Sequence, residues 1–321
     1  MFEYPSGMLK YTLLDGKVVS AKIKQDIRTK VEALKCIQGD KFITPTLAIV
    51  TVGDDPASKV YVKGKIKDCN ECGFHVKHIQ INDYVGDMIV ATLSRLSNDN
   101  SVHGIILQLP LPEEFTKDDE YEYINHINPI KDVDCFTLDN IGKLFYGESD
   151  LKPCTADGIM GLLDYYNIDL AGKDVVIVNR SNIVGKPLAM MMTQRDATVQ
   201  LCHSKTKNLW NKLSRADIIV VGVGKENFID ADDTKPSVIM NGAVVIDIGI
   251  NRNSEGKVVG DVIFKNAIKY ASYITPVPGG VGLMTRACLM KNVFKAYCNQ
   301  VLDPVDIKEI YSEYKCQFEK M

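Results

Sequence analysis

Residues 174–187 constrain the fold of this 321-residue chain more than any other segment. Residues 175–178 are four consecutive β-branched apolar residues, which is typical of a buried strand in a parallel sheet. The polar turn Asn179-Arg180-Ser181-Asn182 follows, and the apolar spacing after it predicts a helix that begins near Gly185. A strand, a tight turn and a helix in this order begin a dinucleotide-binding unit, where backbone N–H groups of the turn and the helix N-terminus suit phosphate.

The turn lacks the usual Gly-x-Gly-x-x-Gly motif, and Asn179-x-Ser181-x-x-x-Gly185 stands in its place. Asparagine tolerates a left-handed backbone, so we predict that Asn179 takes the position where a glycine is usual. On this stretch alone, an ordinary strand-to-helix turn without a ligand is an equal alternative.

The composition indicates a soluble globular protein with room for two domains, because 45% of the residues are hydrophobic and 25% are charged. The net charge of −3 gives no electrostatic affinity for nucleic acid or an anionic membrane. No apolar run is long enough to span a membrane, and the first residues resemble no targeting signal. We therefore expect a cytoplasmic protein.

Nine scattered cysteines, an odd number, argue against a disulfide framework and favour a reducing compartment. Cys69 and Cys72 form a C-x-x-C pair, but it lies in a helical pattern without the preceding strand of a redox motif. We interpret the two as ordinary reduced thiols. The five histidines show no metal-ligand spacing, so we predict no metal.

Strands and helices alternate along the chain in two blocks, which predicts an α/β protein with two α/β domains. Residues 1–150 form the first domain, with predicted strands at 47–52, 74–81 and 103–108. Residues 151–283 form the second, a Rossmann-type doubly wound parallel sheet with predicted strands at 174–178, 197–202, 216–221, 243–247 and 273–275. A helical pattern returns from residue 284, and its charged end, 302–321, is expected to be an exposed helix.

Several motifs in these blocks together resemble the bifunctional methylenetetrahydrofolate dehydrogenase/methenyltetrahydrofolate cyclohydrolase family. They are, in family order over about residues 14–292, Gly53-Asp54-Asp55-Pro56-Ala57-Ser58, Tyr61 with Lys65, Gln108-Leu109-Pro110-Leu111-Pro112, Lys131-Asp132-Val133-Asp134, Pro153-Cys154-Thr155, Arg180-Ser181-x-Ile183-Val184-Gly185-x-Pro187, Cys202-His203-Ser204-Lys205-Thr206, Gly249-Ile250-Asn251 and Thr275-Pro276-Val277-Pro278-Gly279-Gly280-Val281-Gly282. Four residues depart from the family pattern: Asn179 and Cys135 replace glycines, and Ala156 and Leu283 replace prolines. None of these changes removes a group that performs chemistry.

The resemblance implies an enzyme of one-carbon metabolism, with a link to purine biosynthesis. Such an enzyme oxidises 5,10-methylenetetrahydrofolate to 5,10-methenyltetrahydrofolate with NADP and hydrolyses the product to 10-formyltetrahydrofolate. The first domain, 1–150, would bind folate and carry the catalytic residues, with helix 284–321 packing back on it. The second, 151–283, would bind NADP, and folate would lie in a cleft between the two. The family is typically a homodimer, so we expect a homodimer.

Lys65 is the catalytic residue that the resemblance implies, with Gln108 and Tyr61 beside it. Hydrolysis of the methenyl cation needs an activated water and a relocated proton, and a lysine in a desolvating cleft can supply the base. Gln108, at the carboxyl end of a predicted strand, would hold the amine or the water. Tyr61 lies one helical turn before Lys65 and would stack on the aminobenzoyl ring. Without the motif, Lys65 would be interpreted as a solvated lysine among Lys59, Lys63 and Lys67, and Tyr61 as a core residue.

Asp134 suits the pterin, because a carboxylate can accept both parallel donors of an amino-pyrimidine edge. Its neighbour Asp132 is a second candidate for this position, and a carboxylate that caps a turn is the alternative role for either. The loop formed by Pro276, Val277, Pro278, Gly279 and Gly280 would bind folate from the second domain.

The cofactor is predicted to be NADP rather than NAD. NAD enzymes of this fold usually place a carboxylate about 20 residues beyond the phosphate turn, and residues 201–206 contain none. Ser204 and Arg180 can donate to a 2′-phosphate, and Lys205 is near in sequence. The resemblance implies a cofactor-binding set of Asn179, Arg180, Ser181, Gly185, Ser204 and Ile250.

Three alternatives are open at this stage. The chain could be a monofunctional methylenetetrahydrofolate dehydrogenase, a non-catalytic dinucleotide-binding regulator, or a different two-domain NADP dehydrogenase such as one acting on shikimate. Neither of the last two has a use for Lys65, Gln108 and Asp134 together.

Overall fold

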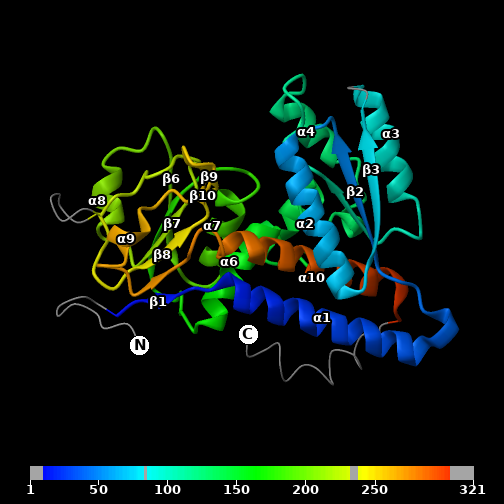
Figure 1. Ribbon diagram of the computed structural model, residues 1–321, viewed down its shortest axis with the longest axis horizontal. Coiled ribbons are helices and arrows are strands. Elements are labelled where there is room, and N and C mark those ends of the chain that lie inside the picture. The colour runs from blue at the N-terminus through cyan, green and yellow to red at the C-terminus, as the bar shows by residue number, and fades with distance from the viewer. Residues whose placement is uncertain (1–9, 83–84, 232–237, 304–321) are drawn as a thin grey trace. The chain divides into compact units, whose positions relative to one another are not determined.

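The computed structural model describes residues 10–82, 85–231 and 238–303, which form two compact units (Figure 1). Among these residues, the six-stranded unit comprises 10–19 and 155–285, and the three-stranded unit comprises 20–154 and 286–303. The sequence assigned residues 1–150 to the first domain, but β1 (Thr12–Leu13) pairs with β11 (Tyr273–Ile274) in the sheet of the six-stranded unit. A strand of two residues is too short to show a period, and its partner lies near the other end of the chain.

The six-stranded unit contains a fully parallel sheet with the order β1-β11-β8-β7-β5-β6. The remaining strands are β5 (Asp174–Val178), β6 (Thr198–Cys202), β7 (Ile218–Val221) and β8 (Val244–Asp247). Strands β7 and β8 are wholly buried, as their continuous apolar sequences require. Because β6 and β7 flank β5 on opposite sides, the strand order reverses at β5, which is the point where ligands bind in open α/β sheets. The predicted Rossmann-type sheet is confirmed.

Short helices and one hairpin complete this unit. They are α6 (Cys154–Tyr165), α7 (Gly185–Thr193), α8 (Leu209–Leu213), α9 (Phe264–Ala267) and the antiparallel pair β9 (Asn251–Arg252) and β10 (Val258–Val259).

The three-stranded unit is built on a parallel sheet with the order β3-β2-β4. Its central strand β2 (Thr46–Val52) is buried throughout, and its alternate residues pack into two separate clusters. Leu47 and Ile49 belong to one cluster, and Ala48 and Val50 belong to the other, so both faces of the sheet are covered. The flanking elements are α1 (Gly16–Gln38), β3 (His75–Ile81), α2 (Pro56–Cys72), α3 (Gly86–Ser97), β4 (Gly104–Leu107), α4 (Lys117–Ile124) and α5 (Leu138–Tyr146), with single-turn helices η1 (Gly39–Lys41) and η2 (Pro129–Lys131).

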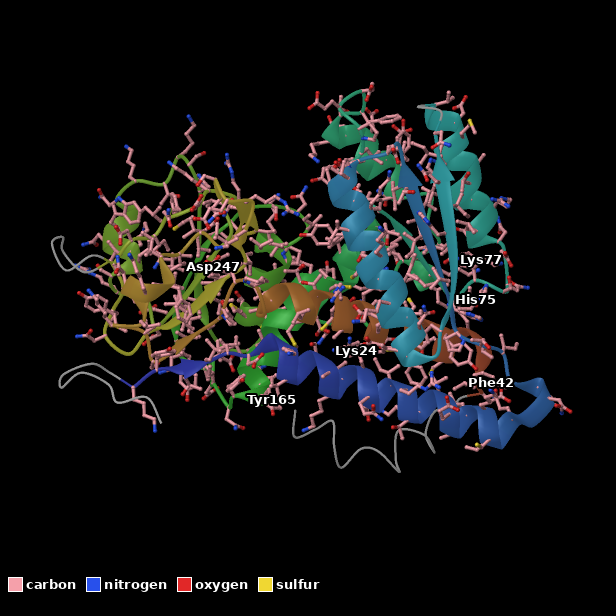
Figure 2. The ribbon with its side chains drawn as sticks, in the orientation of Figure 1. Lys24, Phe42, His75, Lys77, Tyr165 and Asp247 are labelled. Carbon is pink, nitrogen blue, oxygen red and sulfur yellow. The ribbon has the colours of Figure 1, made fainter. Side chains whose placement is uncertain are left out.

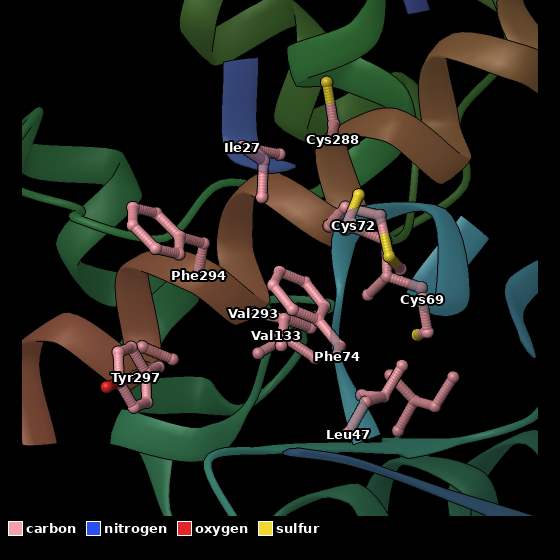
Figure 3. Packing of buried hydrophobic residues seen from close by; sticks show 14 of the residues in the cluster. Ile27, Leu47, Cys69, Cys72, Phe74, Val133, Cys288, Val293, Phe294 and Tyr297 are labelled. Carbon is pink, nitrogen blue, oxygen red and sulfur yellow. The ribbon is translucent and has the colours of Figure 1, made fainter. Parts of the chain in front are cut away.

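Helix α10 (Val281–Val301) contributes to the core of the three-stranded unit from Arg286 onward. Figure 3 shows Cys288, Val293, Phe294 and Tyr297 of this helix among side chains from α1, β2 and α2. Full burial of a side chain such as Val293 or Phe294 stabilises the fold by about 1.5–3 kcal/mol, so α10 is a major part of this core. The exposed helix predicted for the charged tail lies, from residue 304 on, outside the described residues.

The eight cysteines among the described residues are all free thiols, and only Cys36 of these is exposed. Burial raises the pKa of Cys69, and it raises that of Cys72 to about 12. Reactive cysteines have lowered pKa values, so these two thiols fit a structural role. Over the described ranges no helix is long and apolar enough to cross a membrane. No group of three or more His, Cys, Asp or Glu residues suited to a metal ion occurs in the same ranges.

Candidate active site and cofactor site

Helix α2 carries Lys65, and both ends of the helix are fixed by local sequence. Asp55 caps the start by accepting a hydrogen bond from the backbone N–H of Ser58 at 2.7 Å, and Pro56 occupies the first turn. Gly73 ends the helix in a left-handed conformation with φ of 79°. The segment 53–58 that matched the family motif therefore leads into and begins the helix that carries Lys65.

Lys65 Nζ donates a hydrogen bond of 2.9 Å to Gln108 Oε1. Gln108 follows β4 directly, and its backbone N–H donates to Val50 O, so it lies at the carboxyl end of the sheet as predicted. The Nε2 of Gln108 donates to Leu109 O at 2.6 Å, which turns its oxygen toward Lys65. The structure thus brings the two predicted catalytic residues into contact.

The other lysines of α2 are in different environments. Lys59 is paired with Asp54, and Lys67 lies 3.7 Å from Glu71, while Lys63 is exposed. Lys65 is half-buried, and its amine donates to a neutral amide rather than to a carboxylate. A solvated surface lysine does not explain this placement.

Tyr61 lies one turn before Lys65 on α2, and its side chain is 42% exposed. A tyrosine that packed only in the core would be buried, so the alternative role as a core residue does not fit. The exposed part of the residue can contact a ligand.

Asp132 and Asp134 differ clearly in their surroundings. Asp132 is buried and accepts hydrogen bonds from Thr137 N at 2.8 Å and Asn140 Nδ2 at 3.0 Å. Burial raises the pKa of its carboxyl, and these hydrogen bonds oppose that rise. Asp134 is half-buried, and among the described residues no donor bonds its carboxylate. A parallel bridge between Ile105 and Asp132 places this segment beside β4. Asp132 therefore holds the loop, and Asp134 is the carboxylate available to a ligand.

A charge cluster that the sequence did not reveal lies one turn beyond Lys65. Asp68 is buried, and its carboxylate lies 2.7 Å from Lys24 Nζ and 3.1 Å from Arg286 Nε. Lys24 is labelled on α1 in Figure 2. The Arg286 guanidinium lies against Gly64, where an added Cβ would be 2.0 Å from Nη1. The three charges come from three helices, and this is why no local motif signals them.

The structure shows how Cys135 can replace the glycine of the family pattern. Its φ is 60°, a left-handed conformation that a glycine adopts without strain and that costs other residues about 1–2 kcal/mol. Its buried thiol donates to Leu151 O at 3.1 Å. The backbone thus keeps the shape that a glycine allows.

In the turn after β5, Asn179 has a different role from the predicted one. Asn179 was predicted to adopt a left-handed backbone, but it is absent from the described residues with positive φ. Its side chain acts instead: Oδ1 accepts from Ser181 N and Ser181 Oγ, each at 2.8 Å, and Nδ2 donates to Gly222 O at 2.6 Å. Ser181 Oγ in turn accepts from Val184 N at 3.1 Å. Spacing alone could not distinguish a backbone role from a side-chain role.

Gly185 begins α7, where the turn crosses closely over the helix start. An added Cβ would lie 2.2 Å from Asn179 O, so no larger residue fits. The turn still offers donors, because within the described residues no acceptor is found for the backbone N–H groups of Asn182 and Ile183. Two free N–H groups beside a helix N-terminus fit a phosphate.

Arg180 and Ser204 lie at equivalent positions on neighbouring strands. In the parallel register of β5 and β6, Val178 pairs with Cys202, and each candidate residue comes two positions later. Paired strands are about 4.8 Å apart, so the two side chains start side by side at the carboxyl edge. Both residues are exposed, and Lys205 beside Ser204 is exposed as well.

The predicted folate loop Pro276–Gly280 and Ile250 belong to the same six-stranded unit. Gly279 has a φ of 112°, which only glycine adopts readily. Ile250 is 52% exposed, just beyond the end of β8, which is unusual for a large apolar residue and suits contact with a ligand. The predicted cleft between the two domains stays a prediction.

Two protein-family models match the chain, one over each half. The model for the tetrahydrofolate dehydrogenase/cyclohydrolase catalytic domain matches residues 14–134, and the model for the NAD(P)-binding domain of that family matches residues 153–301. The chain belongs to the tetrahydrofolate dehydrogenase/cyclohydrolase family. The Lys65–Gln108 pair and Asp134 lie in or at the edge of the first match, and the phosphate turn lies in the second. Shikimate dehydrogenases and unrelated dinucleotide-binding regulators are thereby excluded as the family.

Individual family members match over most of their length. The bifunctional protein FolD 2 of Geobacter metallireducens is 47% identical over 286 residues, covering 89% of this chain and 96% of that protein. The crystal structure of bifunctional FolD from Campylobacter jejuni superposes with a TM-score of 0.85 at 45% identity, covering 91% of this chain and all of the other. FolD from Trypanosoma brucei, solved with NADP cofactor and an inhibitor, gives a TM-score of 0.85 at 32% identity, covering 92% and 100%.

Proposed function

We propose that this chain performs both activities of its family. It oxidises 5,10-methylenetetrahydrofolate to the 5,10-methenyl form with NADP and hydrolyses that cation to 10-formyltetrahydrofolate. The hydrogen bond between Lys65 and Gln108 carries this conclusion, because hydride transfer alone has no use for a placed amine. Bifunctional relatives of high identity support it.

In the hydrolysis, water adds to the methenyl carbon and loses a proton, and the opening carbon–nitrogen bond leaves a formyl group on one nitrogen. The amine of Lys65 accepts the proton of the attacking water and returns one to the departing nitrogen. Gln108 Oε1 orients the amine through its 2.9 Å hydrogen bond. The exposed ring of Tyr61 stacks on the substrate.

NADP, when bound, supplies the hydride acceptor, and the chain's own residues hold it. The free N–H groups of the turn at 179–185 bind its phosphates, with the backbone close because Gly185 has no side chain. Arg180 and Ser204 bind the 2′-phosphate from adjacent strands. Ile250 contacts the cofactor from the end of β8. An NADP-bound structure of a relative supports this choice.

Asp134 binds the pterin, and the loop Pro276–Gly280 contacts folate. The comparison of Asp134→Asn with Asp132→Asn tests this role. Losing a charge-assisted acceptor pair in Asp134→Asn raises the KM for methylenetetrahydrofolate by about tenfold or more, with the urea midpoint unchanged. Asp132→Asn weakens the Thr137 and Asn140 hydrogen bonds and lowers the stability instead. A higher KM in Asp132→Asn alone, with Asp134→Asn like wild type, would assign the pterin contact to Asp132 instead.

We further propose a cytoplasmic homodimer that serves one-carbon metabolism and, through its formyl product, purine biosynthesis. The free thiols of the described cysteines support a reducing compartment. The family resemblance supports the dimer.

A further inference from the structure

The side chain of Asn179 spans the point where the strand order reverses. Asn179 follows β5, and Gly222 follows β7, its neighbour across that point. The 2.6 Å hydrogen bond from Asn179 Nδ2 to Gly222 O therefore joins the two loops that border the cofactor crevice. A glycine at position 179 could not make it.

The loop beyond Gly222 is held from the other side by Asp261. This carboxylate is fully buried and accepts hydrogen bonds from three successive backbone N–H groups, those of Val223, Gly224 at 3.1 Å and Lys225 at 2.9 Å. It also accepts from Asn251 Nδ2 at 2.8 Å, next to the exposed Ile250. One carboxylate thus fixes both the loop after β7 and the start of β9.

Asp247, labelled in Figure 2, orients Asp261 in turn. Its carboxylate accepts from Asp261 N at 3.1 Å and Val262 N at 2.8 Å. Burial raises the pKa of Asp247 to about 6, against the lowering effect of these hydrogen bonds. Hydrogen bonds and the intervening backbone thus connect one continuous series of residues: Ser181, Asn179, Gly222, the 223–225 loop, Asp261 and Asn251.

We propose that Asn179 and Asp261 are positioning residues for the cofactor, and that they set the phosphate turn and the loop after β7 in one fixed arrangement. The inference rests on the proposed NADP site. Asn179 Oδ1 accepts from the Ser181 N–H and hydroxyl, and the neighbouring N–H groups of Asn182 and Ile183 have no acceptor among the described residues, so they can donate to phosphate. The hydrogen bonds of the Asn179 side chain thereby fix the turn, where a glycine would leave the backbone flexible.

The matched variants Asn179→Ala and Asn179→Gly test these hydrogen bonds, because both remove the side-chain amide. Both variants weaken NADP binding by about tenfold, measured as the calorimetric Kd. The kcat of oxidation stays within about twofold of wild type. Without any cofactor, hydrogen exchange of the 223–225 amides becomes faster in both. The urea midpoint and the circular dichroism spectrum of each variant show that it is folded.

Coupling to Asp261 gives an independent test. Asp261→Asn leaves an amide group against backbone N–H donors and also weakens NADP binding. Because the two residues act through the same connected hydrogen bonds, the double variant with Asn179→Ala loses clearly less NADP affinity than the product of the two single losses. Tighter NADP binding in Asn179→Gly, unchanged exchange at 223–225, or a fully multiplicative double variant would overturn the proposal. A wild type that binds no NADP would instead overturn the proposed function.

Discussion

Replacing Lys65 with methionine lowers the cyclohydrolase rate by about 100-fold or more, the usual scale for loss of a general acid–base group. Methionine keeps the length of the side chain and removes the amine that donates to Gln108. NADP-dependent oxidation falls less, because hydride transfer needs no side-chain base. The measurement is the rate of methenyltetrahydrofolate decay above that in buffer, together with the urea midpoint.

Lys63→Met on the same helix is the control, because Lys63 is exposed and two residues from Lys65. It keeps both activities and the same stability. Near-wild-type hydrolysis in a well-folded Lys65→Met would return Lys65 to the role of a solvated lysine. A similar loss in both variants would point to the helix rather than to the amine.

Replacing Arg180 with alanine lowers kcat/KM for NADP by about 10- to 100-fold, as expected for loss of a hydrogen-bonded charge pair of about 1.5–3 kcal/mol. The value for NAD changes little, because NAD has no 2′-phosphate. Ser204→Ala acts in the same direction but by less, since it removes one neutral donor. The matched assay is kcat/KM with both cofactors for wild type and each variant.

NAD is the internal control in this experiment, because both cofactors use the same phosphate turn. Equal losses for NADP and NAD would assign Arg180 to the shared pyrophosphate rather than to selectivity. A wild type that prefers NAD would contradict the cofactor assignment and leave the folate chemistry intact.

Much of the fold is predictable because strong signals are local. Buried strands such as 175–178 are continuous apolar runs, and the helix from Pro56 is marked by its cap and proline. Lys65 and Gln108 were predicted from motifs 43 positions apart, and the structure joins them. Hydrophobic period and local turn chemistry suffice for these features.

The features that sequence did not reveal depend on long-range contacts. β1 is two residues long, and it is recognisable as a strand only by its pairing with β11. Asp261 and Arg286 carry no motif of their own, since their partners come from other segments. At Asn179 the predicted left-handed backbone is wrong, because a residue's preference for φ says nothing about which partner its side chain finds.

The progress curve of purified wild-type protein with methylenetetrahydrofolate and NADP tests the central claim most directly. NADPH and methenyltetrahydrofolate are followed by absorbance in the same reaction, with the decay of the methenyl form in buffer as reference. The account predicts that NADPH exceeds accumulated methenyltetrahydrofolate and that 10-formyltetrahydrofolate makes up the difference, faster than buffer decay allows. Methenyltetrahydrofolate that accumulates in step with NADPH, and then decays only at the buffer rate, would contradict it.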